Sequence, residues 1–113
     1  MEDRNRVQVP EVIRRYLDAH DRRDTEVALA TFAPDATVDD EERHFRGPDE
    51  IRTFLTTAGA EFTYTRTFVD AQSVDDAWVI HNRLEGDFPG GVADLRYQFV
   101  LIDGLIAQLV IAP

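Results

Sequence analysis

The chain has 113 residues, a length typical of one domain, and it lacks two reactive residue types altogether. Neither Lys nor Cys occurs, all 12 basic side chains are Arg, and Ser73 is the sole serine. This composition excludes lysine Schiff bases, thiol nucleophiles, disulfides and cysteine-ligated zinc. The formal net charge of −10 argues against nucleic acid and anionic membranes as partners, because both attract basic surfaces. Any acid–base chemistry must therefore use Asp, Glu, His or Tyr.

The hydrophobic content predicts a folded domain rather than a disordered acidic chain, since 43% of the residues are hydrophobic. No apolar run reaches the roughly 18 residues that a membrane span requires. The first residues also lack the apolar segment of a secretory signal. We therefore expect a cytoplasmic protein that forms a single domain over residues 1–113, with residues 1–8 as a flexible N-terminus.

The first half of the chain carries the helical signals. Pro10 suits the first turn of a helix, and apolar residues then recur at helical spacing. Asp24 is a preferred N-cap residue for a second, short helix, which Pro34 terminates. An acidic run at 39–42 separates two short extended pieces. The predicted elements are helices over 12–20, 25–32 and 51–57 and strands over 36–38 and 44–46.

After residue 60 the apolar period changes to two, which indicates strands. The dipeptide Asp103-Gly104 is a strong signal for a two-residue hairpin turn between the last two strands. The predicted strands cover 62–69, 78–84, 95–101 and 105–111. Helices followed by a strand meander indicate an α+β fold, in which the helices cover one face of a curved, mainly antiparallel sheet.

Two stretches of the sequence resemble a known superfamily. The first runs from Val12 to Asp40 and contains Phe-Ala-Pro-Asp-Ala-Thr-Val at 32–38, and the second is Gly-Pro-Asp-Glu-Ile-Arg-Thr-Phe at 47–54. The chain resembles the nuclear-transport-factor-2-like (NTF2-like) superfamily, in particular its SnoaL-like and ketosteroid-isomerase-like members. The resemblance implies a cone-shaped half-barrel with three N-terminal helices packed on the concave face of the sheet. It also implies a hydrophobic pocket inside the cone and a homodimer formed through the outer face of the sheet.

The resemblance to ketosteroid isomerases implies three candidate catalytic residues. Tyr16 matches the tyrosine that stabilises an oxyanion, and Asp40 matches the general base. Tyr97 falls where a hydrogen-bond-donating carboxylic acid is normal, and a phenol can donate in its place. Enolisation needs such a base and such donors. The alternatives are core packing for both tyrosines and a solvated acidic run for Asp40, with Asp39 as the neighbouring choice of base.

Further candidates for ligand contact share the faces that are predicted to point inward. His20 follows Tyr16 by one helical turn, where it either polarises a ligand or is a partly buried, hydrogen-bonded histidine. Asn82 alternates with apolar residues on a strand and needs partners if it is buried. The remaining candidates for ligand binding are Phe32, Phe54, Trp78 and Phe99.

Three functions are compatible with these residues, because the superfamily hosts several reactions and non-enzymatic members. The first is a small-molecule-binding isomerase or cyclase that moves a proton on a hydrophobic carbonyl compound, with Asp40 as base and Tyr16 as oxyanion donor. The second is a non-catalytic ligand-binding or dimerisation module. The third is an epoxide-hydrolase-like protein, for which Asp94 and Arg96 are the nearest pair, although we expect them to lie on the outward face of the sheet. The scattered histidines predict no metal site, and no cofactor is expected.

Overall fold

The structure is a computed structural model that describes residues 9–58, 60 and 62–113. The predicted flexible N-terminus, residues 1–8, lies outside the described residues. The described part folds as helices and strands in α+β order, as predicted. The helices are α1 (Glu11–Asp21), α2 (Thr25–Leu29) and α3 (Gly47–Thr57). The strands are β1 (Phe32–Asp40), β2 (Arg43–Arg46), β3 (Tyr64–Val74), β4 (Ala77–Gly86), β5 (Val92–Ile102) and β6 (Leu105–Ala112).

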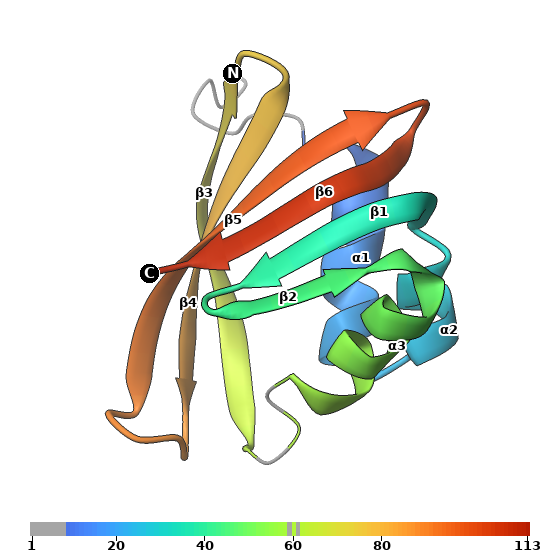
Figure 1. Cartoon of the computed structure of the whole chain (residues 1–113). Coiled ribbons are helices and arrows are strands. Elements are labelled where there is room, and N and C mark those ends of the chain that lie inside the picture. Colours follow the sequence, from blue (N-terminus) through green and yellow to red (C-terminus); the bar gives the residue numbers. More distant parts are fainter. Residues whose placement is uncertain (1–8, 59, 61) are drawn as a thin grey trace.

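Six strands of the described residues form one curved, open sheet in the order β2-β1-β6-β5-β4-β3 (Figure 1). Neighbouring strands are antiparallel, except that β1 runs parallel to β6. This parallel pair joins the N-terminal hairpin β1–β2 to the meander β3–β6. Between β5 and β6, Asp103 and Gly104 both have positive φ, which matches the hairpin turn that their sequence predicts.

The helices gather at the end of the sheet that contains β1 and β2 (Figure 1). α3 packs against β1 and β2, α1 contacts β6, and α2 packs against both other helices. The helix starts follow the sequence signals. Pro10 precedes α1, the Asp24 carboxylate accepts a hydrogen bond from the Val27 backbone N–H at 3.4 Å, and Pro48 lies in the first turn of α3.

The second helix is shorter than the predicted range 25–32, and Phe32 is instead the first residue of β1. Thr31 is buried, and its hydroxyl donates to the Ala28 carbonyl oxygen at 2.6 Å, which closes the last helical turn. Pro34 pushes the residue before it out of the helical region. The strand therefore begins ahead of this proline, because the chain is already extended there.

A bulge in β3 changes which residues face inward. The strand pairs with β4 continuously up to Phe68, after which the register shifts before Asp70. Tyr64 and Arg66 are partly buried before the shift, whereas the next buried residue is Ala71, which is out of phase with them. Phe68 itself is 48% exposed on this edge strand. The alternation predicted over 62–69 therefore ends at the bulge.

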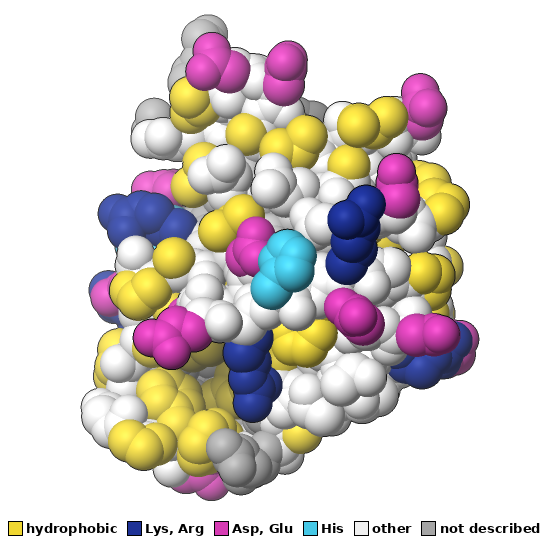
Figure 2. Space-filling model, viewed as in Figure 1, with side chains coloured by type: hydrophobic (Ala, Val, Ile, Leu, Met, Phe, Trp, Pro, Cys, Tyr) yellow, Lys and Arg dark blue, Asp and Glu magenta, His cyan; other side chains and the backbone are white. Residues whose placement is uncertain are grey.

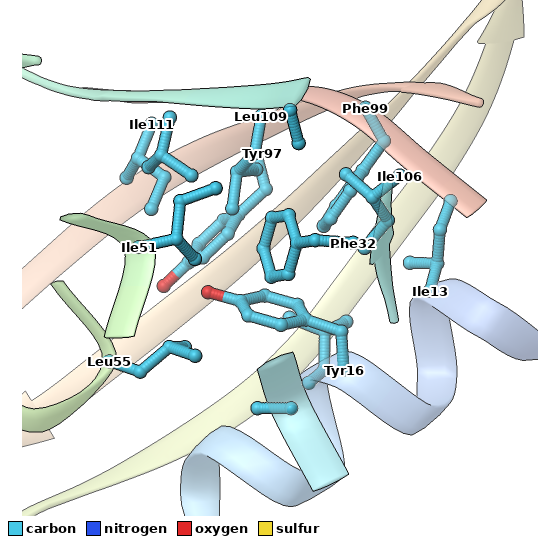
Figure 3. Packing of buried hydrophobic residues seen from close by; sticks show 14 of the residues in the cluster. Ile13, Tyr16, Phe32, Ile51, Leu55, Tyr97, Phe99, Ile106, Leu109 and Ile111 are labelled. Carbon is cyan, nitrogen blue, oxygen red and sulfur yellow. The ribbon is translucent and has the colours of Figure 1, made fainter. Parts of the chain in front are cut away.

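The hydrophobic core lies between the helices and the sheet (Figure 3). Tyr16 of α1 is fully buried at its centre. The rings of Phe32 and Phe99 meet the Tyr16 ring edge-on, with centroid separations of 5.5 and 5.8 Å. Phe54 of α3 packs against Phe45 of β2 at a centroid separation of 5.4 Å. These rings fix α1 and α3 relative to the sheet, and Phe54 also lines a cavity.

Candidate functional site

A cavity of about 250 Å³ lies between α1, α3 and the inner side of β3–β5. This volume lies just below the range of roughly 300 to 1,000 Å³ that is typical of ligand pockets, so it suits a small compound of one or two rings. Its wall is mainly apolar. Hydrophobic side chains also gather at the lower left of Figure 2, over the ends of β4 and β5 from which several lining residues come. The apolar lining residues are Leu17, Phe54, Ala58, Phe62, Leu84, Phe88, Ala93, Leu95 and Ile111. The polar lining residues are His20, Asp21, Asp40, Glu41, Tyr64, Arg66 and Tyr97.

Asp40 reaches this cavity from the last position of β1, where the strand pairs with β6. Burial raises the pKa of the Asp40 carboxyl, the Glu41 charge raises it further, and Arg43 opposes the shift. A raised pKa makes the carboxylate a stronger proton acceptor. Asp39 does not line the cavity and pairs instead with His44 across the β1–β2 hairpin. Of these two neighbouring carboxylates, therefore, Asp40 is the one that lines the cavity.

Tyr97 contributes a phenol to the cavity wall from β5. Its side chain is only 8% exposed, and burial raises the pKa of its hydroxyl, with a further contribution from Tyr64. The Tyr97 hydroxyl therefore stays protonated at neutral pH and can donate a hydrogen bond. Figure 3 shows the hydroxyl groups of Tyr97 and Tyr16 extending to the same side of the core, towards α3.

Tyr16 does not line the cavity, but its hydroxyl contacts His20, which does. The Tyr16 hydroxyl is 3.1 Å from His20 Nδ1, and burial raises the pKa of this tyrosine well above its usual value. Burial, together with the nearby charge of Arg23, lowers the pKa of His20 to about 4. His20 is therefore neutral at pH 7 and carries one ring proton.

The Arg23 guanidinium also approaches His20. Its Nη1 atom donates to the Ala58 carbonyl oxygen at 2.9 Å and lies 3.4 Å from His20 Nε2. Because neutral imidazole has one donor and one acceptor nitrogen, the Tyr16 hydroxyl and His20 Nδ1 share a single hydrogen bond.

Arg66 is a functional candidate that the sequence analysis missed. Its side chain is 13% exposed at the cavity wall, and its Nε and Nη2 atoms donate to Asp21 Oδ2 at 2.9 and 2.8 Å. Nη2 also lies 3.6 Å from Asp18 Oδ1, and Nη1 donates to Asn82 Oδ1 at 3.2 Å. Helix α1 and strand β3 are far apart in sequence, so no local spacing could predict this cluster. The available signal was a charged residue on the inward side of an alternating strand.

The structure brings four of the predicted site residues to the cavity wall and places the others around it. The four are His20, Asp40, Phe54 and Tyr97. Phe32 and Phe99 surround Tyr16 in the core, Trp78 packs half-buried against the core, and Asn82 is fully buried beside Arg66. The cavity is therefore lined by part of the predicted set, and the remaining members lie in or against the hydrophobic core, outside the lining.

The Asp94 and Arg96 pair lies away from the cavity, on the outward face of β5, as expected. Arg83 Nε donates to Asp94 Oδ1 at 2.9 Å, and this hydrogen bond holds the pKa of Asp94 below its usual value. His81 Nε2 also lies 3.3 Å from the same oxygen. These contacts belong to the outer face of the sheet.

The described residues, 9–58, 60 and 62–113, offer neither a cluster of metal ligands nor a membrane-spanning helix. These residues contain no group of three His, Asp or Glu side chains arranged to hold a metal ion. None of their helices is both long enough and apolar enough to span a bilayer.

The family model of the SnoaL-like domain matches residues 13–108 of the chain. No curated protein matches. Among solved structures, a Sinorhizobium meliloti protein assigned provisionally as a polyketide cyclase is 32% identical, with a TM-score of 0.86. The match covers 92% of this chain and 95% of that one.

Two more distant structures share the fold. A Catenulispora acidiphila protein with a ketosteroid isomerase-like fold, crystallised with trimethylamine, is 16% identical with a TM-score of 0.81. That match covers 94% of this chain and 87% of the other. A Sphaerobacter thermophilus protein is 24% identical with a TM-score of 0.77, over 89% of this chain and 91% of that chain. At these identities the similarity establishes the fold alone.

Proposed function

Because the chain belongs to the SnoaL-like domain family of the NTF2-like superfamily, we propose that it binds a small hydrophobic carbonyl compound and moves a proton on it. The observation that carries this proposal is the position of Asp40. Its carboxylate, with a raised pKa, lines an apolar cavity together with the Tyr97 phenol. This is the pairing of base and donor that enolisation requires.

In the proposed reaction, the Asp40 carboxylate takes a proton from the carbon next to the carbonyl group. The electron pair of that C–H bond moves towards the carbonyl oxygen, which becomes an enolate. The Tyr97 hydroxyl, which lines the cavity, donates a hydrogen bond to this oxygen. Tyr16, the oxyanion donor that the resemblance implies, acts from behind the cavity wall through its contact of 3.1 Å with His20. In an isomerisation, Asp40 then returns the proton to another carbon of the ligand. In a cyclisation, the enolate carbon instead attacks a second carbonyl carbon of the ligand, the electron pair of that C=O bond moves to its oxygen, and Asp40 returns its proton to this oxygen.

The remaining parts of this proposal concern the shape and setting of the site. We expect the cavity to be the interior of a cone-shaped half-barrel, with the helices on the concave face of the sheet. The contacts of α3 with β1 and β2, and of α1 with β6, support this arrangement. We also expect a single cytoplasmic domain that needs no metal or cofactor.

The test uses β-tetralone, a two-ring ketone with an acidic C–H, as the probe compound. We expect the protein to accelerate exchange of the protons next to its carbonyl group in D₂O, measured by NMR against buffer alone. Binding of β-tetralone without accelerated exchange would support the alternative of a non-catalytic ligand-binding module. Absence of both binding and exchange would contradict the proposed function for this class of ligand.

The epoxide-hydrolase alternative is tested with styrene oxide in the same protein preparation. The Asp94 and Arg96 pair lies outside the cavity, so we expect no hydration of this compound above the buffer rate. Formation of the diol at an enzymatic rate would favour the epoxide-hydrolase function over the proton-transfer function.

We also propose that the protein forms a homodimer through the outer face of the sheet. That face mixes apolar and charged side chains and includes Ile102, which is 57% exposed. Light scattering at micromolar concentration is expected to give twice the mass of the 12.9 kDa chain. Ile102→Glu should shift the mass towards a monomer, because it places a charge on the apolar part of the surface. A wild-type monomer would contradict the proposal.

A further inference from the structure

The chain contains three tyrosines, and two of them, Tyr64 and Tyr97, line the cavity. Tyr16 does not line it, and its hydroxyl shares a hydrogen bond with His20. Tyr97 has a role in the proposed reaction, whereas Tyr64 has none there. The Tyr64 side chain is partly exposed and forms part of the cavity wall, so a bound ligand can touch it.

The backbone of β3 directs the Tyr64 side chain to the inward face of the sheet. Tyr64 is the first residue of the strand and alternates with Arg66, which also lines the cavity, while Thr65 between them is exposed. Across the strand pair, Tyr64 lies opposite Gly86 of β4. A Cβ atom at Gly86 would lie only 2.5 Å from Tyr64 Cβ, so this close approach requires a glycine. The tyrosine therefore leaves the strand packed against the glycine backbone.

The Arg23 guanidinium holds the other end of the Tyr64 side chain. Arg23 Nη2 donates to the Tyr64 hydroxyl oxygen at 3.4 Å, and its Cζ atom lies 5.9 Å from the centre of the Tyr64 ring. Arg23 Nη1 donates to the carbonyl oxygen of Ala58, which lines the cavity. Because a guanidinium can only donate, the Tyr64 oxygen accepts, and the hydroxyl proton has no acceptor among the described residues. This proton is available to a ligand.

The Tyr64 hydroxyl lies near the other phenols of the site. Besides burial, the charge of Tyr64 does most to raise the pKa of Tyr97, and it also raises the pKa of Tyr16. The charge of an ionised tyrosine is centred on its phenolic oxygen, so these effects require the oxygen atoms to be near one another. The hydroxyl end of Tyr64 therefore points inward, towards the cavity.

Asp40 and Tyr64 lie on opposite sides of the cavity. Their strands, β1 and β3, are separated in the sheet by β6, β5 and β4, and the sheet is curved (Figure 1). Because both residues nevertheless line the same cavity, they face each other across it, and Tyr97 of β5 stands between them. A ligand whose carbonyl group meets Asp40 and Tyr97 thus directs its far end towards Tyr64.

We propose that Tyr64 donates a hydrogen bond to a second oxygen atom of the ligand, and that Arg23 is the positioning residue for its hydroxyl. This inference rests on the proposed function, because it takes the cavity to be the ligand site and places the reacting carbonyl group at Asp40 and Tyr97. It narrows the ligand class to compounds with an acceptor oxygen at each end of the ring system. A compound without the second oxygen leaves the Tyr64 proton unused and binds less tightly.

The first test compares trans-2-decalone with trans-decalin-2,6-dione by isothermal titration calorimetry. The two compounds share one ring system, and the second carbonyl group of the dione can accept a hydrogen bond but cannot donate one. We expect the wild-type protein to bind the dione at least about fivefold more tightly. Tyr64→Phe keeps the ring and removes the hydroxyl, so it should abolish this preference. Thr67→Val is the control, because it removes a hydroxyl from an exposed position of the same strand and should leave the preference unchanged.

The outcomes separate this inference from the proposed function. Loss of the dione preference in Tyr64→Phe, with binding of 2-decalone retained, supports the inference. An unchanged preference in this variant, or a wild-type protein without any preference, overturns it, while the cavity stays a ligand site. If the wild-type protein binds neither compound, the proposed function fails for these ligands and the inference fails with it.

The second test observes the tyrosines directly and decides the matter if Tyr64→Phe does not fold. Incorporation of 3-fluorotyrosine gives one ¹⁹F NMR signal for each of the three tyrosines, and Tyr16→Phe and Tyr97→Phe assign them. We expect both compounds to shift the Tyr97 signal and the dione to shift the Tyr64 signal further than 2-decalone does. Equal Tyr64 shifts with both compounds would overturn the inference. An unmoved Tyr97 signal with both compounds bound would contradict the proposed function instead.

The positioning role of Arg23 is tested with Arg23→Lys. Lysine keeps the positive charge but cannot bond to the Ala58 carbonyl and the Tyr64 hydroxyl together in the same fork geometry. The dione preference should fall towards that of Tyr64→Phe, with the affinity for 2-decalone unchanged. Arg22→Lys is the matched control, because Arg22 lies 3.9 Å from Asp24 and does not line the cavity. A merely structural role of Arg23 would lower the melting temperature and weaken both compounds equally.

Discussion

Asp40→Asn is expected to lower the rate of proton exchange on β-tetralone at least about 100-fold while leaving the protein folded. The amide has the size of the carboxylate but cannot accept the proton. Asp39→Asn is the matched control, because Asp39 is the preceding residue, pairs with His44 and does not line the cavity. NMR in D₂O measures the exchange rate of both variants, and urea unfolding measures their stability. Together they distinguish a loss of catalysis from a loss of folding.

The pH dependence of the wild-type rate provides a second signature of the same residue. Only the ionised Asp40 accepts a proton, so kcat/KM should fall as the pH is lowered through the pKa of Asp40. Since burial raises that pKa, the fall should begin at a higher pH than for an exposed aspartate. If Asp40→Asn retains the wild-type rate, or the same acidic limb, another residue is the base.

Phe99→Ala is expected to lower the free energy of unfolding by about 4 kcal/mol. Its ring is 0% exposed and packs edge-on against Tyr16, so its removal leaves a void at the centre of the core. Phe68→Ala is the matched control, with the same change at a side chain that is 48% exposed, and should cost roughly 1 kcal/mol. Urea unfolding of both variants measures the difference.

Phe99→Leu keeps the measurement accessible if the alanine variant does not fold. It should have a stability between those of Phe99→Ala and the wild type, because leucine fills part of the void. Equal costs for Phe99→Ala and Phe68→Ala would contradict the arrangement of the core around Tyr16.

The sequence was sufficient for those elements whose signals are local. Asp24 as N-cap and Asp103-Gly104 as a hairpin turn act within a few residues, and both are confirmed. The prediction of helix up to Phe32 was wrong, because pairing of that residue with β6 and the nearby Pro34 outweigh its helical spacing. The bulge after Phe68 was also missed. It arises from the pairing register of β3 with β4, and no residue type at this position predicts it.

The residues that line the cavity were predicted only in part, because some of the contacts around it join segments that are distant in the sequence. Asp40, Tyr97, His20 and Phe54 line the cavity, and they come from the residues that the resemblance and the periodicity indicated. The bonds of Arg66 to Asp21 and Asn82 join α1, β3 and β4. Contacts of this kind exist only after the chain has folded, so composition and spacing contain no direct signal for them.

The position of β6 between β1 and β5 determines the order in which the site can assemble. The strand that follows all the others in sequence is the one that connects the N-terminal hairpin to the meander. Asp40 pairs with Ile111, and the Glu41 backbone N–H donates to the Ile111 carbonyl oxygen at 3.1 Å. Such distant pairings form slowly. Until β6 has paired with both of its neighbours, Asp40 and Tyr97 lie on two pieces of sheet that no pairing between the described strands connects.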